Sequence, residues 1–201
     1  MKNQKNKSEG FTLIELIISF TILVIIVTIA GLFFNNVLNL NALFGGGLET
    51  SSEVESASQI MATEIRSTAP SNIGSYAIDT ASSSVLIFYS DIDEDGLFER
   101  IRYFVDGVIL KKGVIKPTGN PLTYNPVNEV ITEQIHNLVP AASSTFSYYD
   151  SNYTGSEPPM APPINIAAVR IIGVRINAQE KKGAVASFNA FITPRNLRSN
   201  L

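Results

Sequence analysis

The feature that most restricts this chain is an apolar run near its N-terminus. Residues 11–34 read FTLIELIISFTILVIIVTIAGLFF, and Glu15 is the one charged residue among them. A helix of this length extends about 36 Å, which is enough to cross a hydrocarbon core of about 30 Å. The few polar residues of the run do not gather on one face, so it is not typical of a half-buried helix in a soluble domain. The run therefore predicts a membrane-spanning helix.

The charges beside the run indicate how the chain would lie across the membrane. Lys2, Lys5 and Lys7 precede the run, and no comparable basic cluster follows it. Basic residues are retained in the cytoplasm, so residues 1–10 are predicted to be cytoplasmic and the C-terminal part to lie outside. A secretory signal peptide is the alternative interpretation. The run is longer than the apolar region of most signal peptides, however, and no clear A-x-A cleavage site follows it.

Glu15 is the informative exception within the run. A carboxylate near the centre of a helix in lipid costs on the order of 3 kcal/mol. Glu15 either lies near enough to the cytoplasmic end to reach the headgroups or meets a positive partner in an assembly. The sequence GFTLIE at residues 10–15, followed by the apolar run, resembles the N-terminal signal of type IV pilins and type II secretion pseudopilins.

This resemblance implies how the N-terminus is processed and used. A prepilin peptidase would cut between Gly10 and Phe11 and then N-methylate Phe11. Glu15 would act in assembly by pairing with the Phe11 amine of a neighbouring subunit. The implied partners are the peptidase, other pilins or pseudopilins in a filament, and the bacterial cytoplasmic (inner) membrane. No nucleic-acid partner is predicted, because the formal net charge of the chain is -3.

The chain after the run predicts an α+β, pilin-like fold with a long N-terminal helix packed on an antiparallel β-sheet domain. Gly45-Gly46-Gly47 predicts a hinge, a melted stretch or a plain linker, because each glycine weakens a helix. A capping box at residues 50–53 would then restart the helix. The predicted parts are a leader (1–10), a transmembrane and assembly helix (11–44), a hinge with the second half of the helix (45–69), and an extracytoplasmic domain (70–201).

Helical periodicity identifies the face of the second half that would pack on the sheet. Four apolar residues share this face: Val54, Ala57, Met61 and Ile65. Three acidic residues are predicted on other faces: Glu53, Glu55 and Glu64. A helix end is expected near residues 69–70, where a proline follows.

Alternating apolar residues predict strands in the C-terminal part. The predicted strands are 84–90, 97–105, 108–112, 145–149, 169–178 and 184–192, whereas 127–135 is ambiguous between strand and helix. The first three form a meander, and the last two form a hairpin around residues 180–183. The strings SDIDEDGLFERIRYF, FSYYD, AAVRIIGVRI and FITPRNL are similar to the larger minor pseudopilins, especially the J type.

Composition excludes several kinds of chemistry. The chain has no cysteine, which rules out a disulfide framework and a thiol nucleophile, and its single histidine, His136, argues against a multi-histidine metal site. No catalytic motif occurs, so the chain is predicted not to be an enzyme. Tyr148, Tyr149 and Tyr153 are interpreted as core or interface residues. The lysine pairs at 111–112 and 181–182 are interpreted as solvated turn charges.

One loop predicts a cation site. The sequence DIDEDG at residues 91–96 resembles a D-x-D-x-D-G calcium loop. Asp91, Asp93 and Asp95 would supply oxygen ligands, and Glu99 would add another. The loop lacks the distal bidentate glutamate, because Arg102 holds that position. Calcium is therefore a possible cofactor and none is required; the alternative is a hairpin turn whose acidic residues are solvated.

The sequence predicts a structural subunit: a minor pseudopilin of a type II secretion pseudopilus, which by family resemblance would sit at the filament tip. The alternative within this class is a minor pilin of a type IV or DNA-uptake pilus, because the N-terminal signal is shared. The alternative of another class is a membrane-anchored enzyme or binding module.

Overall fold

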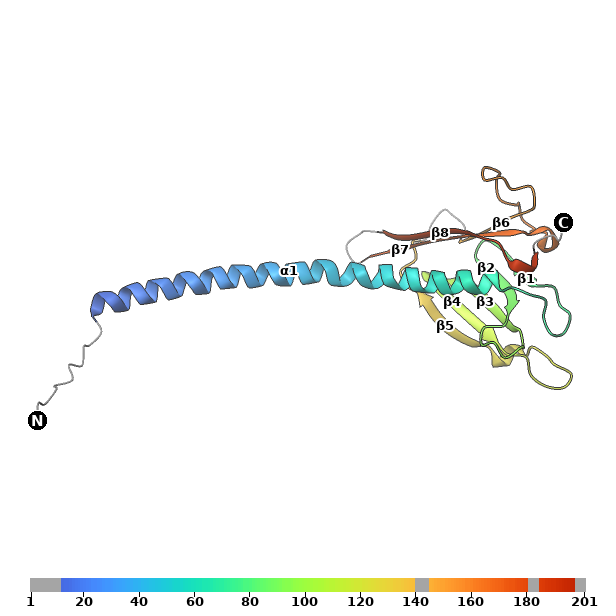
Figure 1. The fold of residues 1–201 in the computed structure, drawn as a ribbon, viewed down its shortest axis with the longest axis horizontal. Helices are drawn as coiled ribbons and strands as arrows, with labels where there is room; N and C mark the ends of the chain where they lie inside the picture. The colour runs from blue at the N-terminus through green and yellow to red at the C-terminus, as the bar shows by residue number, and fades with distance from the viewer. Residues whose placement is uncertain (1–11, 140–144, 181–184, 198–201) are drawn as a thin grey trace, which may run out of the picture. The chain divides into compact units, whose positions relative to one another are not determined.

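The computed structural model describes residues 12–139, 145–180 and 185–197, and of residues 38–49 it describes the backbone alone. This part of the chain contains one long helix, α1 (Leu13–Arg66), and eight β-strands (Figure 1). It divides into two compact units, Met1–Gly45 and Gly46–Leu201. The predicted α+β class, with one long apolar N-terminal helix and antiparallel strands, is confirmed.

The backbone of α1 is helical through residues 45–47, so the melted stretch considered from the sequence is absent from this structure. Glycines weaken a helix by about 1 kcal/mol each. A break, however, would require a second costly nucleation on its far side. The expected capping box at residues 50–53 is wrong for the same reason, because these residues lie inside α1 and not at a helix start.

The second half of α1 packs as its periodicity predicted. Val54, Ala57, Met61 and Ile65 are all buried, and Met61 and Ile65 are fully so. Further buried positions of the same helix are Ser58, Ala62 and Glu64. At about 100° per residue, the buried positions cover an arc of about 160°. One sheet face does not surround so wide an arc, so the helix needs cover from two sides.

Five strands form the first sheet, in the order β1-β2-β3-β4-β5, and every neighbouring pair is antiparallel. Their bounds are β1 (Ile78–Ala81), β2 (Val85–Ser90), β3 (Glu99–Asp106), β4 (Ile109–Ile115) and β5 (Val130–Ile135). The predicted meander is β2-β3-β4. The ambiguous segment forms a 3-10 turn (Pro126–Asn128) and then β5. Strand β1 was not predicted, because its sequence IDTA is short and half polar.

Three strands form the second sheet, in the order β6-β7-β8. They are β6 (Phe146–Tyr149), β7 (Ile171–Gln179) and β8 (Val185–Ile192). One core cluster contains buried residues of both sheets and of α1, and Figure 1 draws the second half of α1 between the two sheets. The strand pattern predicted these strands but not their division into two sheets. That division covers both sides of the wide apolar arc on α1.

Candidate functional site

The first turn of α1 is held by a reciprocal pair of hydrogen bonds. The backbone N–H of Glu15 donates to Oγ1 of Thr12 at 3.4 Å, and the backbone N–H of Thr12 donates to Oε2 of Glu15 at 3.4 Å. This is a capping box, in which each side chain satisfies an amide that the helix leaves without a partner. The spacing T-x-x-E at residues 12–15 could have predicted it. Gly10 and Phe11, the predicted cleavage and methylation residues, lie outside the described residues.

The helix that follows this cap has an entirely exposed apolar surface. Leu13–Val37 is long and apolar enough to cross a membrane, with a mean hydropathy of 2.9 and no buried residue. The hydroxyls of Thr21 and Thr28 donate to the carbonyls of Ile17 and Val24, each at 2.8 Å. Because these hydroxyls are satisfied within the helix, they add little polar surface to the span.

The loop between β2 and β3 is folded around Asp91. Oδ1 of Asp91 accepts a hydrogen bond from the backbone N–H of Asp95 at 3.2 Å, and Oδ2 of Asp91 accepts one from the backbone N–H of Gly96 at 3.0 Å. Gly96 has a φ of +87°, which favours glycine. Ser90 pairs with Glu99 in the last register position before the loop. This pairing brings Glu99, the first residue of β3, next to the start of the loop.

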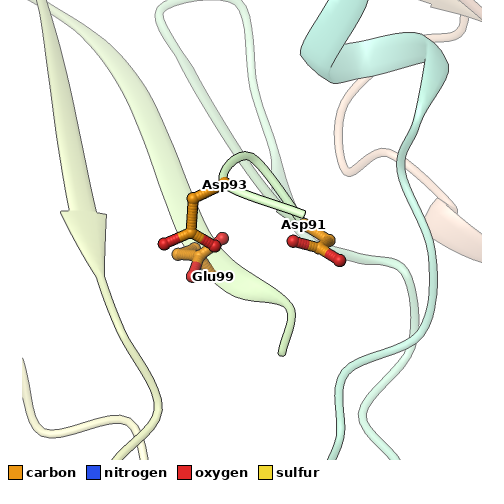
Figure 2. Close-up of side chains that lie close together, drawn as sticks. All are labelled: Asp91, Asp93 and Glu99. Carbon is orange, nitrogen blue, oxygen red and sulfur yellow. The ribbon is translucent and has the colours of Figure 1, made fainter. Parts of the chain in front are cut away.

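Three carboxylates meet at this loop (Figure 2). One oxygen each of Asp91, Asp93 and Glu99 lies within 4.8 Å of the others. Glu99 is fully buried. Its Oε2 accepts the backbone N–H of Ile92 at 3.0 Å, while its Oε1 has no hydrogen-bond partner. The fourth predicted ligand, Asp95, is not brought into this group, and its Oδ1 accepts the backbone N–H of Leu97 at 2.8 Å.

The charges at this cluster are partly compensated. Lys116, one residue after β4, forms an ion pair with Asp93. This hydrogen bond lowers the pKa of Asp93 and raises the pKa of Lys116. Burial has the opposite effect on Glu99, whose pKa is raised because its charged form loses hydration. Of the three carboxylates, Asp93 is therefore compensated by an ammonium, whereas the buried Glu99 is poorly compensated.

His136 lies outside the carboxylate cluster, in a bridge between the helix and the sheet. Its Nδ1 lies 2.6 Å from Glu53 of α1, and its Nε2 lies 3.0 Å from Glu133 of β5. The side chain of His136 is 45% exposed. The hydrogen bonds to Glu53 and Glu133 raise the pKa of His136. This arrangement joins α1 to β5 and does not hold a nucleophile.

A buried ion pair was missed by the sequence analysis. Glu64 of α1 is buried, accepts the Tyr103 hydroxyl at 2.7 Å and pairs with Lys112. The prediction that Glu64 lies on another face is wrong, and so is the interpretation of Lys112 as a solvated turn charge. Lys112 is the cross-strand partner of Tyr103. Only the register of β3 and β4 reveals this contact.

The remaining predicted residues are placed as follows. Tyr148 is a core residue, and its hydroxyl donates to the carbonyl of Ser82 at 2.8 Å. Tyr149 and Tyr153 are partly exposed and pack against each other with their rings tilted by 42° and the ring centroids 4.2 Å apart. The lysines at 181–182 lie outside the described residues.

Comparison with known proteins bears on the N-terminus. Residues 5–31 match the prokaryotic N-terminal methylation motif. No curated protein matches the chain. The motif and the exposed apolar span together define a prepilin-type, membrane-anchored protein. More particularly, this motif is the N-terminal signal of the type IV pilin and pseudopilin family, and it supports a type IV pilin-like or pseudopilin subunit. This family is structural, and its motif implies cleavage by prepilin peptidase and assembly with other pilins.

Proposed function

We propose that the chain is a minor pseudopilin of a type II secretion pseudopilus, resembling the J type and positioned at the filament tip. The observation that carries the filament-subunit part of this proposal is the methylation motif at residues 5–31, which overlaps a fully exposed apolar helix. The choice of a J-type pseudopilin rests on the sequence resemblance of the C-terminal part. The absence of any buried residue along Leu13–Val37 means that this surface needs lipid or like helices to cover it. A bilayer provides the first cover, and a bundle of neighbouring helices provides the second.

Topology follows from the charges on the leader. The basic residues at positions 2, 5 and 7 keep residues 1–10 in the cytoplasm, and the unit that contains both sheets lies outside. Prepilin peptidase cuts between Gly10 and Phe11, and the new amine of Phe11 is methylated.

Glu15 gives the bundle its register. In the isolated subunit, its carboxylate caps its own helix through Thr12. In the filament, it pairs with the cationic amine of Phe11 on a neighbouring subunit. Leaving one side of a buried ion pair without its partner costs about 3–5 kcal/mol. A subunit that still carries its leader has no amine at Phe11, so it is excluded from the bundle.

Mass spectrometry tests the processing step. The full chain is co-produced with a prepilin peptidase, and the N-terminal peptide of the purified protein is sequenced. The expected product begins with N-methylated Phe11. A Gly10→Val variant, which changes the residue before the cut, is expected to keep its leader. Recovery of intact chain only, or of a chain cut after the apolar span, would overturn the proposal.

Cysteine crosslinking distinguishes a pseudopilus from a pilus. The chain has no cysteine, so a single introduced cysteine reports one position. Ile17→Cys on the apolar helix is produced in cells with either a type II secretion system or a type IV pilus system, with Ser187→Cys on the exposed side of β8 as control. The proposal expects crosslinks from position 17 to pseudopilins. Crosslinks to pilins alone would favour the minor-pilin alternative, and none in either system would favour a membrane-anchored enzyme or binding module.

A further inference from the structure

We infer that the β2–β3 loop holds a calcium ion through Asp91, Asp93 and Glu99, and that the ammonium of Lys116 competes with that ion. This site does not depend on the proposed function. It uses residues of the unit Gly46–Leu201, whereas the methylation motif lies at residues 5–31.

The buried oxygen of Glu99 is the observation that points to a ligand. Glu99 has no exposed surface, and among the described residues its Oε1 finds no hydrogen-bond donor. Burying a carboxylate oxygen without a partner is strongly unfavourable, and folded proteins rarely leave such an atom unsatisfied. The same carboxylate contributes to the group of three oxygens within 4.8 Å (Figure 2). The unsatisfied oxygen therefore belongs to a cluster of hard oxygen ligands.

The charge balance favours a divalent cation over Lys116 alone. When all three carboxylates of the cluster are ionised, they and the one ammonium leave a formal charge of -2 at the cluster, since -3 plus +1 is -2. Lys116 compensates Asp93 but does not hydrogen-bond to Glu99. Its side chain is 59% exposed, so the ammonium can move into solvent at little cost when a cation enters.

The ligand type favours calcium. All three side chains offer carboxylate oxygens, which are the ligands of hard cations. Each oxygen of Asp91 accepts one amide and keeps a second lone pair for a metal. Magnesium requires near-ideal octahedral geometry, whereas calcium accepts irregular sets of oxygens and completes them with water. A partly exposed site with three carboxylates is expected to have a Kd on the order of 0.1–1 mM, as in extracellular calcium modules.

Calcium titration of the full chain in neutral detergent tests the inference. Isothermal calorimetry after removal of metal with a chelator measures affinity, and thermal unfolding with and without calcium gives a second readout. Asp93→Asn and Glu99→Gln are each expected to weaken binding by at least about tenfold, because each removes a charged ligand. Asp95→Asn is the matched control in the same loop, and its affinity should stay within about threefold of wild type.

Lys116→Met separates a metal site from a simple ion pair. Removing the competing ammonium is expected to tighten calcium binding by about tenfold. In the alternative, Lys116 and a proton on Glu99 neutralise the carboxylates of the cluster without a metal ion. Neither the wild type nor any variant then binds calcium, and Glu99→Gln leaves the thermal stability unchanged. That result would overturn the inference. It would also be overturned by equal affinity for magnesium, or by calcium binding that survives both Asp93→Asn and Glu99→Gln. Circular dichroism confirms that each variant is folded.

Discussion

The buried pair between Glu64 and Lys112 gives the sharpest prediction about stability. The side chains of Lys112 and Glu64 are 11% and 10% exposed, and Tyr103 donates a second hydrogen bond to Glu64 at 2.7 Å. Lys112→Met leaves a buried carboxylate with one neutral donor and no counter-ion. Removing one partner of a buried ion pair lowers the free energy of unfolding by about 3–5 kcal/mol.

A second substitution should restore part of this loss. In the double variant Glu64→Gln/Lys112→Met, the amide oxygen still accepts the Tyr103 hydroxyl, and no uncompensated charge remains in the core. The double variant is therefore expected to be more stable than Lys112→Met alone, with a coupling of about 2 kcal/mol. Glu64→Gln alone should cost about 1–3 kcal/mol.

Urea unfolding of the full chain in neutral detergent measures these differences. The chain has seven tyrosines and no tryptophan, so the near-ultraviolet circular dichroism of the tyrosines reports tertiary packing. Lys111→Met is the control, because Lys111 pairs with Asp106 at the surface and should matter little. If Lys112→Met costs no more than Lys111→Met, or if the effects of the two core substitutions simply add, the reasoning is wrong.

Two further predictions concern the second half of α1. The hydrogen bonds to Glu53 and Glu133 raise the pKa of His136 in the folded protein. The stability that protonated His136 contributes is therefore complete below the pKa of His136 in the unfolded chain, about 6.5, and is lost as the pH rises through its pKa in the folded protein. The difference in unfolding temperature between wild type and His136→Gln should accordingly shrink from pH 6 to pH 9, and a difference that grows would contradict the bridge. Met61 is fully buried whereas Ile60 is half exposed, so Met61→Ala should cost about 2–5 kcal/mol in urea unfolding and Ile60→Ala less than about 0.5 kcal/mol. If the two substitutions lowered the free energy of unfolding equally, Met61 would not be the buried residue and Ile60 the exposed one.

Local pattern accounts for most of what could be predicted about the fold. The apolar run and the stripe through Val54 and Met61 are periodic along one element, so neither requires knowledge of a partner. The Glu64–Lys112 contact depends on the register between β3 and β4 and on where α1 crosses them. Residues 48 positions apart meet there, and no local pattern encodes that distance. The short strand β1 is defined by its pairing with β2 and not by its own composition.

The β2–β3 loop shows the same division between local and long-range information. The spacing of Asp91 and Asp93 is a local pattern, and the structure brings both residues together with Glu99. Burial of Glu99 and the approach of Lys116 could not be predicted, because both follow from the pairing of β3 with its two neighbours. Asp95 has the right spacing, yet its carboxylate is used by the backbone of the turn.

The capping box at the start of α1 affects how subunits could join a filament. In a pilin-like assembly, Glu15 would exchange one set of partners, the amides and hydroxyl of its own first turn, for the amine of another subunit. The carboxylate of Glu15 would therefore keep hydrogen-bond partners in a subunit that lies in the bilayer before assembly. Because Glu15 would have polar partners in both settings, its own contribution to the free energy of incorporation would be smaller than the cost of an unpaired buried carboxylate. The Glu15 pair would then select which subunits join, while adding little to the stability of the finished filament.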